Sequence, residues 1–198
     1  TLARLLTGLY TGYEGEIRLG GHDLEKIHPR TLRNTVWMLP QRVHLFNGTI
    51  RRNILAADPE ASDEQLERAI QLADLEPFVR SLYMGVHHMV GEGGAGISGG
   101  EQLKIALARL FLSDPDVVIL DEASSVLDVE SEGRILANVR TVFRDRTVLT
   151  IAHRLHTVRM ADRILVLEKG ALVESGTHDE LMDRSGMYAS FMKQYLDF

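Results

Sequence analysis

The sequence predicts an α/β fold with a parallel sheet, interrupted by a segment that is mostly helical. Three short runs rich in β-branched and aliphatic residues predict strands at residues 35–39 (TVWML), 117–120 (VVIL) and 147–151 (TVLTI). Apolar runs of this length are too short for helices and are typical of buried parallel strands. Stretches with helical periodicity lie between them, which is the alternation expected of an α/β domain.

Length and composition fit one globular domain. The 198 residues are 44% hydrophobic, which is enough to bury a core. The net charge of −6 argues against binding to nucleic acid, which favours a basic stripe. The sequence has no cysteine, so disulfides and cysteine-bound metals are excluded. No apolar run could span a bilayer and no signal peptide is visible, so we expect any membrane attachment to come from partners or from further sequence.

The first residues indicate that the sequence starts inside a longer protein. Residues 1–10 (TLARLLTGLY) have the pattern of an amphipathic helix, but no helix-start signal precedes them. Residues 15–21 (GEIRLGG) then predict a short strand and a turn. The strand at 35–39 stops at Pro40, because proline cannot donate to a sheet. Gln41 therefore presents its amide at the carboxyl end of that strand.

The helical segment is expected at residues 43–113, as a subdomain inserted between two parts of the core at residues 1–42 and 114–198. Within it, Ser62 and Gln65 have the spacing of a capping box, in which each side chain bonds the other residue's backbone amide. The apolar residues that follow this box recur at helical spacing, so a helix with one buried face is predicted there.

Two neighbouring apolar residues, Leu45 and Phe46, are expected in a loop at the start of this subdomain. Exposed apolar residues often mark the surface that binds a partner. Packing of the same two side chains into the core is the alternative, and the residues themselves do not decide between the two.

A glycine-rich stretch at residues 91–96 (GEGGAG) formally matches the G-x-G-x-x-G pattern of dinucleotide-binding sites. That pattern needs a strand before it and a helix that opens within it. Residues 87–90 make a poor strand, and the predicted helix at residues 103–112 begins only after a second glycine pair. The dinucleotide interpretation therefore fails on its context.

The second glycine pair follows Ser98, where that helix must begin. The first amides of a helix have no partner within it, and the helix dipole makes this end positive. Gly99 and Gly100 would let an anion approach these amides closely, which favours a phosphate site. Alternatively, Ser98 and Glu101 form a capping box that satisfies the amides without a ligand. The residues leave both interpretations open.

Polar residues follow each of the three predicted strands. Gln41 follows the first, Asp121 and Glu122 the second, and His153 the third. Ligands of open α/β sheets bind beyond the carboxyl ends of the strands, so we expect these side chains to share one site. Two adjacent carboxylates suit two tasks, since one can hold Mg²⁺ while the other orients or deprotonates a water molecule.

The remaining sequence predicts further elements of the core. Residues 128–143 form an amphipathic helix, and residues 163–167 with 171–174 form a hairpin. Thr177 and Glu180 have the spacing of another capping box. The last helix presents one apolar face to the core, made by Tyr188, Phe191, Tyr195 and Leu196.

Several of these motifs, in this order, resemble those of the nucleotide-binding domain of ABC transporters. Residues 97–101 (ISGGE) are similar to the signature sequence LSGGQ, with Ile97 and Glu101 as departures. Residues 117–122 (VVILDE) resemble the Walker B strand with its following glutamate, and residues 125–128 (SVLD) resemble the D-loop. Residues 43–54 (VHLFNGTIRRNI) look like those of exporter-type domains.

This resemblance implies a P-loop NTPase-like ABC ATPase core with a parallel sheet and an inserted helical subdomain, binding ATP and Mg²⁺. Asp121 and Gln41 would hold Mg²⁺, and Glu122 would be the general base. Gln41 and His153 would position the attacking water and the γ-phosphate. The negative charge of Glu101 would lie near the triphosphate.

The resemblance also implies partners. ATP would lie between the phosphate loop of one copy and residues 98–100 of a second copy, in a head-to-tail dimer to which Asp128 also contributes. Thr1 would be the tail of the phosphate loop. Because the rest of that loop is absent from the sequence, we expect the chain on its own to be inactive. A transmembrane domain, fused upstream, would place the chain at the cytoplasmic face of the inner membrane.

Two alternatives remain to this reading. One is a soluble ABC ATPase that acts on nucleic acid, and the other is an inactive fragment that lacks its phosphate loop. Coiled-coil insertions or a second tandem core would mark the soluble class, and the sequence shows neither. Its acidic balance also speaks against nucleic acid as a partner.

Overall fold

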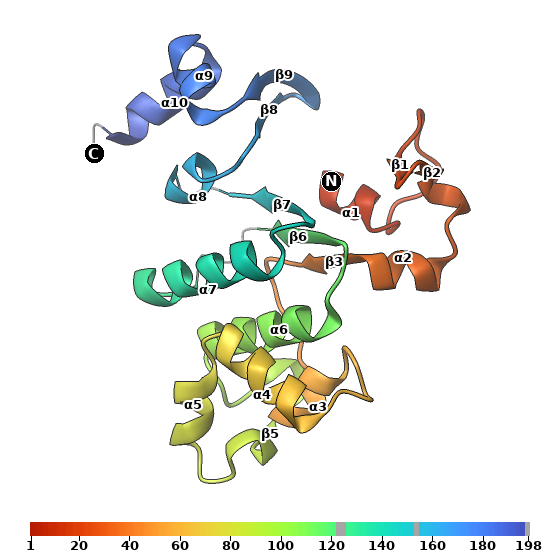
Figure 1. Ribbon diagram of the computed structural model, residues 1–198, viewed down its shortest axis with the longest axis vertical. Helices are drawn as coiled ribbons and strands as arrows, with labels where there is room; N and C mark the ends of the chain where they lie inside the picture. Colours follow the sequence, from red (N-terminus) through yellow and green to blue (C-terminus); the bar gives the residue numbers. More distant parts are fainter. Residues whose placement is uncertain (122–125, 153–154, 197–198) are drawn as a thin grey trace. The chain divides into compact units, whose positions relative to one another are not determined.

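The structure is a computed structural model that describes residues 1–121, 126–152 and 155–196 (Figure 1). The chain forms two compact units, Thr1–Leu149 and Thr150–Phe198. Each unit is described by itself below.

A parallel sheet runs through the middle of the first unit. Its strand order is β3 (Val36–Leu39), β6 (Val117–Asp121), β7 (Thr147–Ile151), so β6 is the central strand. β3 and β6 pair in parallel, with Leu39 opposite Leu120. The sequence predicted all three strands, and their positions are confirmed. This sheet lays the carboxyl ends of β3 and β6 side by side.

Helix α6 (Gly99–Ser113) packs against β3 and forms the base on which the other helices lie. It contacts both α3 (Ile50–Leu55) and α4 (Asp63–Leu72), while α5 (Glu76–Ser81) follows α4. One hydrophobic cluster joins these helices to the sheet, so the helices and the strands share a single core. The division of the chain into core and helical subdomain at residues 43–113 stays a prediction.

Helix α7 (Val129–Val142) is the other long helix of this unit, and it confirms the helix predicted at residues 128–143. The ring of Phe143, which follows α7, stacks on that of Phe111 in α6 with 5.9 Å between the centroids. Ile135 and Val139 of α7 are buried in the same core. Helix α6, which begins at the glycine pair, and helix α7, which follows the acidic pair in sequence, are therefore packed together.

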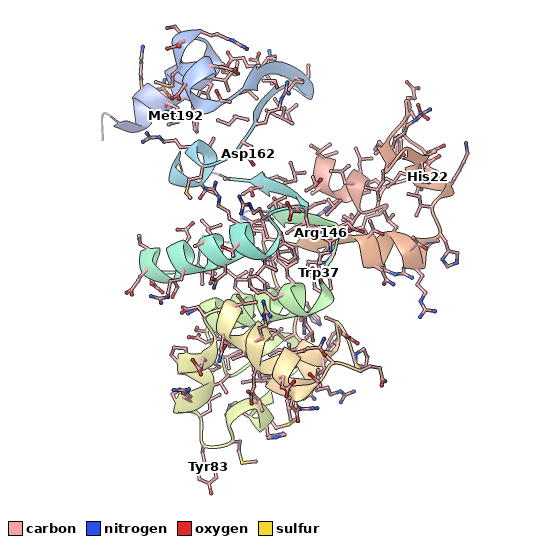
Figure 2. The ribbon with its side chains drawn as sticks, in the orientation of Figure 1. His22, Trp37, Tyr83, Arg146, Asp162 and Met192 are labelled. Carbon is pink, nitrogen blue, oxygen red and sulfur yellow. The ribbon has the colours of Figure 1, made fainter. Side chains whose placement is uncertain are left out.

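Shorter elements complete the first unit. The hairpin of β1 and β2 is antiparallel, as is the pair β4 and β5, which closes the helical part of the chain. Tyr83, in the loop after α5, projects freely into solvent with 101% relative exposure (Figure 2). The bounds of these elements are α1 (Leu2–Leu6), β1 (Arg18–Leu19), β2 (His22–Asp23), η1 (Leu24–Lys26), α2 (Pro29–Thr35), β4 (Gly48–Thr49), η2 (Gly85–His87), β5 (Met89–Val90) and η3 (Glu92–Gly94).

The second unit consists of a hairpin and three short helices. Strands β8 (Ile164–Glu168) and β9 (Ala171–Gly176) are antiparallel, as predicted. Lys169 and Gly170 join them with φ of 49° and 85°, the pair of positive values that a type I′ turn requires. The helices are α8 (Leu155–Arg159), α9 (His178–Asp183) and α10 (Met187–Leu196). No helix in the described part of the chain is long and apolar enough to cross a membrane.

Both predicted capping boxes at α4 and α9 are confirmed. Ser62 and Gln65 exchange both hydrogen bonds, at 2.8 and 3.2 Å. Thr177 and Glu180 do the same at 3.0 and 3.3 Å. These caps explain why the two helices begin where the sequence said they would.

Some expectations were wrong. The helix expected over residues 1–10 ends at Leu6, and Gly8 with a φ of 69° breaks it. For Leu45 and Phe46 the sequence had left two interpretations open: Leu45 is fully buried and belongs to the core, whereas Phe46 is 55% exposed. Phe191 was expected in the core but is 43% exposed. Tyr188 is buried as expected, and Ala189 and Met192 complete the buried face of α10.

Strand β7 also departs from what its sequence indicates. Its apolar run predicted a buried strand, but its residues are exposed or only half-buried, and Val148 is 37% exposed. The five residues of β7 do not reveal how far the strand is buried, because burial depends on which other elements pack against it.

Candidate functional site

The carboxyl ends of β3 and β6 lie side by side. Because Leu39 pairs with Leu120 in a parallel register, Pro40 and Asp121 follow at the same edge of the sheet. Gln41, one residue further on, is exposed, and Asp121 is half-buried. The structure thus brings together the strand ends that carry two of the predicted site residues. Glu122 and His153 lie outside the described residues, so their positions stay predictions.

The residues at this edge fit a magnesium ion. A carboxylate and a side-chain amide both offer oxygen, the ligand that Mg²⁺ prefers. No cluster of three or more His, Asp or Glu side chains within the described residues could hold a metal by itself. Mg²⁺ is usually bound by one or two carboxylates together with substrate phosphates and water. Asp121 with Gln41 would hold it in that way, and a bound phosphate would complete the ligands.

The turn before α6 forms only half of its capping box within the part of the chain that the structure describes. The amide of Glu101 donates to Oγ of Ser98 at 3.4 Å, which is a long bond. The return bond, in which the backbone amide of Ser98 would donate to the Glu101 carboxylate, does not form. The helices α4 and α9, by contrast, have both bonds. The cap therefore accounts for one of the free amides at this helix end and leaves the others open to a ligand.

No contact among the described residues requires glycine at this turn. Gly99 and Gly100 are helical, with no positive φ. A Cβ on Gly100 would lie 3.5 Å from the carbonyl oxygen of Val126, and one on Gly99 would lie 4.0 Å from Val126 Cγ1. Both distances are ordinary contacts. Alanine would fit and would favour the helix by about 1 kcal/mol at each position. The absence of side chains therefore makes room for something that approaches from outside the chain.

The turn at residues 126–128 lies against this glycine pair. Leu127 is buried, and Val126 is 56% exposed beside the glycines. Asp128 caps α7, because its Oδ1 accepts the backbone hydrogen bond from Ser131 at 2.9 Å. That bond lowers the pKa of the Asp128 carboxyl below its usual value. The start of α7 is thereby fixed next to the start of α6. Ser125, the first residue of this motif, lies outside the described residues.

The other glycine loop has an internal explanation. Gly94 has a φ of 89°, and a Cβ there would come within 2.4 Å of the Gln102 side chain. Nε2 of Gln102 donates to the carbonyls of Gly94 and Ile97 at 3.1 and 3.3 Å. The loop needs glycine in order to fold onto α6, and not to approach a cofactor. This agrees with the rejection of the dinucleotide interpretation.

A polar cluster formed by Asn53 and Arg109 was not anticipated from the sequence. Asn53 is fully buried, and its side chain exchanges two hydrogen bonds of 2.9 Å with the backbone of Phe46. Arg109 of α6 donates to the carbonyl and to Oδ1 of Asn53, at 2.7 and 2.6 Å, and to the carbonyl of His44 at 3.0 Å. Burial lowers the pKa of the Arg109 guanidinium. The cluster holds the segment after Gln41 onto the helix that begins at the glycine pair. Its signal in the sequence was an arginine within the apolar run of α6.

Comparison with known proteins identifies the family. Residues 1–125 match the family described as ABC transporter, which is more than half of the chain. The chain belongs to the ABC transporter family. It is 44% identical over 194 residues to the ATP-dependent lipid A-core flippase of Escherichia coli (strain K12) and, equally, to that of Shigella flexneri. These matches cover 98% of this chain and 33% of each relative, so the chain spans about a third of their length.

A solved structure agrees with this assignment. The ATP-bound structure of a bacterial Atm1-family ABC exporter matches with a TM-score of 0.94 and 38% identity, over 98% of this chain and 34% of that one. The ABC chain described here is thus homologous to the ATPase domain of ABC exporters, and the predicted fold class is confirmed. The roles of individual site residues stay predictions, including those of Thr1, Ser98, Glu101 and Asp128.

Proposed function

We propose that this ABC chain is the ATP-binding and ATP-hydrolysing domain of an exporter. The observation that carries the proposal is the parallel register of β3 and β6. It lays the end of β6, which carries Asp121, beside the end of β3, which leads to Gln41. This is the edge at which α/β sheets bind their ligands.

The proposed chemistry is phosphoryl transfer from ATP to water. Mg²⁺, when bound, would neutralise the charge that develops on the transferred phosphate. In this arrangement Asp121 and Gln41 hold the ion, and the Glu122 carboxylate accepts a proton from the attacking water. His153 donates a hydrogen bond to the γ-phosphate. Such a reaction depends mainly on positioning and charge neutralisation, which these side chains supply.

A second copy of the chain is the proposed partner at the nucleotide. In the turn formed by Ser98, Gly99 and Gly100 the first two residues are exposed, and no contact with the described residues calls for its glycines. A head-to-tail pair would set this turn and its helix dipole against ATP held by the other copy. Glu101 and Asp128 would lie at the same interface, and Thr1 would lie at the bound phosphates of its own copy.

A transmembrane domain of the same transporter is the other proposed partner, with the chain at the cytoplasmic face of the inner membrane. The support is that the flippase and exporter relatives are about three times longer than the region they share with this chain. The alternative of a nucleic-acid-binding ABC ATPase has no observation in its favour, and the net charge of −6 argues against it.

The substitution Glu122→Gln tests the proposed general base. In the full-length protein we expect the turnover of ATP to fall by about 10²- to 10⁴-fold, because glutamine cannot accept the proton. Release of inorganic phosphate measures this. Glu67→Gln, at an exposed position of α4, is the matched control and should leave the rate unchanged. Turnover within a few-fold of wild type in Glu122→Gln would show that this carboxylate is not the base.

A further inference from the structure

One carboxylate ties three helices of the first unit together. Asp74 follows α4, and its side chain is 13% exposed. Nζ of Lys104, from α6, lies 2.8 Å from its Oδ2. From α7, Oγ of Ser131 donates to Oδ2 at 2.8 Å, and Arg134 donates to both oxygens at 2.9 and 3.1 Å. All of these groups contact the Asp74 carboxylate directly.

The backbone at this position favours a different residue. Asp74 has a φ of 55°, the left-handed conformation that ends many helices. The amide of the next residue, Leu75, bonds back to the carbonyl of Ile70 at 3.0 Å, which closes the helix end in the usual way. Glycine is the commonest residue in this conformation, and aspartate is one of the few others that tolerate it. Aspartate in place of glycine at a point where three helices meet suggests that its side chain has a task there.

The contacts of Asp74 lead to both turns of the proposed nucleotide site. Lys104 lies one helical turn after Gly100, on the helix that the glycine pair opens. Its Nζ also donates to Oγ of Ser131 at 3.1 Å. The backbone amide of Ser131 is in turn bonded to Asp128, the cap of α7. The same carboxylate therefore restrains the first turns of α6 and of α7.

We propose that Asp74 is a positioning residue for the ATP site, which it does not touch. It holds the turn at residues 98–100 and the turn at residues 126–128 in one fixed arrangement, through Lys104 and Ser131. This inference rests on the proposed function, because the two turns matter only if they meet a nucleotide. Without the carboxylate, the nearly buried ammonium of Lys104 loses its charged partner, and the two helix starts are no longer linked through it.

The test uses Asp74→Asn in the full-length protein. Asparagine keeps the size of the side chain and tolerates the left-handed backbone, so the charge is the main loss. We expect the turnover number for ATP to fall roughly 3- to 30-fold. The KM for ATP should change by less than about two-fold, since the loss concerns an arrangement used only when the site closes. Asp63→Asn is the control, because it removes an exposed carboxylate at the start of α4, the partner of Arg51 from α3, and should leave both constants unchanged.

A second pair of variants separates positioning from general weakening of the fold. Asp74→Gly relieves the backbone and removes the side chain, and we expect it to lose turnover at least as strongly as Asp74→Asn. Ser131→Ala should lose turnover too, and the double variant Asp74→Asn/Ser131→Ala should be no worse than the more severe single one, because the two residues act through one link.

The outcomes are distinct. Wild-type turnover in Asp74→Gly or Asp74→Asn, with only a lower melting temperature, would show a purely structural role and overturn the inference. Additive losses in the double variant would also overturn it. If Asp74→Asn does not fold, Asp74→Gly and Ser131→Ala decide the question. If the unmodified protein shows no hydrolysis that depends on Glu122, the proposed function fails and this inference fails with it.

Discussion

At the scale of single residues, Asp74 should make the stability of the protein depend on pH. Burial would raise the pKa of its carboxyl, but hydrogen bonds from Arg134, Lys104 and Ser131 outweigh this and lower the pKa from 3.8 to about 2. A lowered pKa stabilises the folded state above pH 4, and this stabilisation disappears as the pH falls toward 2. The shift corresponds to about 2 kcal/mol.

Thermal unfolding of the wild-type protein and of Asp74→Asn, measured between pH 7 and pH 2, checks this expectation. The difference in unfolding free energy should be constant from neutral pH down to about pH 4 and should then shrink. A difference that persists unchanged at pH 2 would mean that the charge of Asp74 does not contribute.

Two glycines at neighbouring points of the chain should respond in opposite ways to the same substitution. Gly100→Ala should leave the unfolding free energy unchanged or raise it by up to about 1 kcal/mol, because the added methyl fits and favours the helix. ATP turnover should nevertheless fall, since the methyl would occupy the space proposed for the nucleotide. Gly94→Ala should do the reverse and destabilise the fold, because a φ of 89° strains alanine and its Cβ would displace the Gln102 side chain, which bonds the carbonyls of Gly94 and Ile97.

Melting curves and phosphate release on the two variants test this pair. Loss of stability in Gly100→Ala comparable to that in Gly94→Ala would show that both glycines serve the fold alone. Normal stability with normal turnover in Gly100→Ala would remove the reason for placing the nucleotide at this turn.

At the scale of secondary structure, the buried side-chain amide of Asn53 should contribute more to the free energy of unfolding than its size suggests. It bonds the backbone of Phe46 and receives the guanidinium of Arg109. In Asn53→Ala these groups lose their partner while they remain buried, which we expect to cost roughly 2–3 kcal/mol. The control is Asn34→Ala, at an exposed position of α2. Equal melting temperatures for the two variants would contradict the structural role of the cluster.

The elements themselves were largely predictable because their signals are local. β-branched runs gave the strands, and serine or threonine three residues before glutamine or glutamate gave the helix starts at Ser62 and Thr177. What sequence reasoning missed depends on partners far along the chain. Nothing near Leu45 shows that it is buried while Phe46 is not, because the residues that cover Leu45 come from other elements.

The candidate site was predictable in part for the same reason. A polar residue follows each of these strands, and the carboxyl ends of parallel strands lie at one edge of a sheet. The ends of β3 and β6 could therefore be expected to meet. The supporting contacts could not be predicted, since Asp74 and Ser131 lie 57 positions apart and Asn53 and Arg109 lie 56 apart. Such pairs carry no periodicity that a single sequence reveals.

At the scale of the whole molecule, Glu101 tests whether two copies share one nucleotide. It is one of the two residues that depart from the family signature, and it would place a negative charge near the triphosphate held by the other copy. Like charges repel, so Glu101→Gln in the full-length protein should lower the KM for ATP by about 2- to 5-fold at low salt, with Glu67→Gln unchanged.

Salt gives this prediction its sharpest form. The effect of Glu101→Gln should shrink at about 1 M salt, where the Debye length is only about 3 Å, because a repulsion across an interface accessible to water is screened. Steady-state ATPase titrations at both ionic strengths measure it. A KM that does not respond to the substitution, or responds equally at both salt concentrations, would place Glu101 away from the nucleotide. The head-to-tail pairing would then lose its electrostatic support, whereas the placement of Asp121 and Gln41 at one edge of the sheet would stand, because it depends on strand register within one copy.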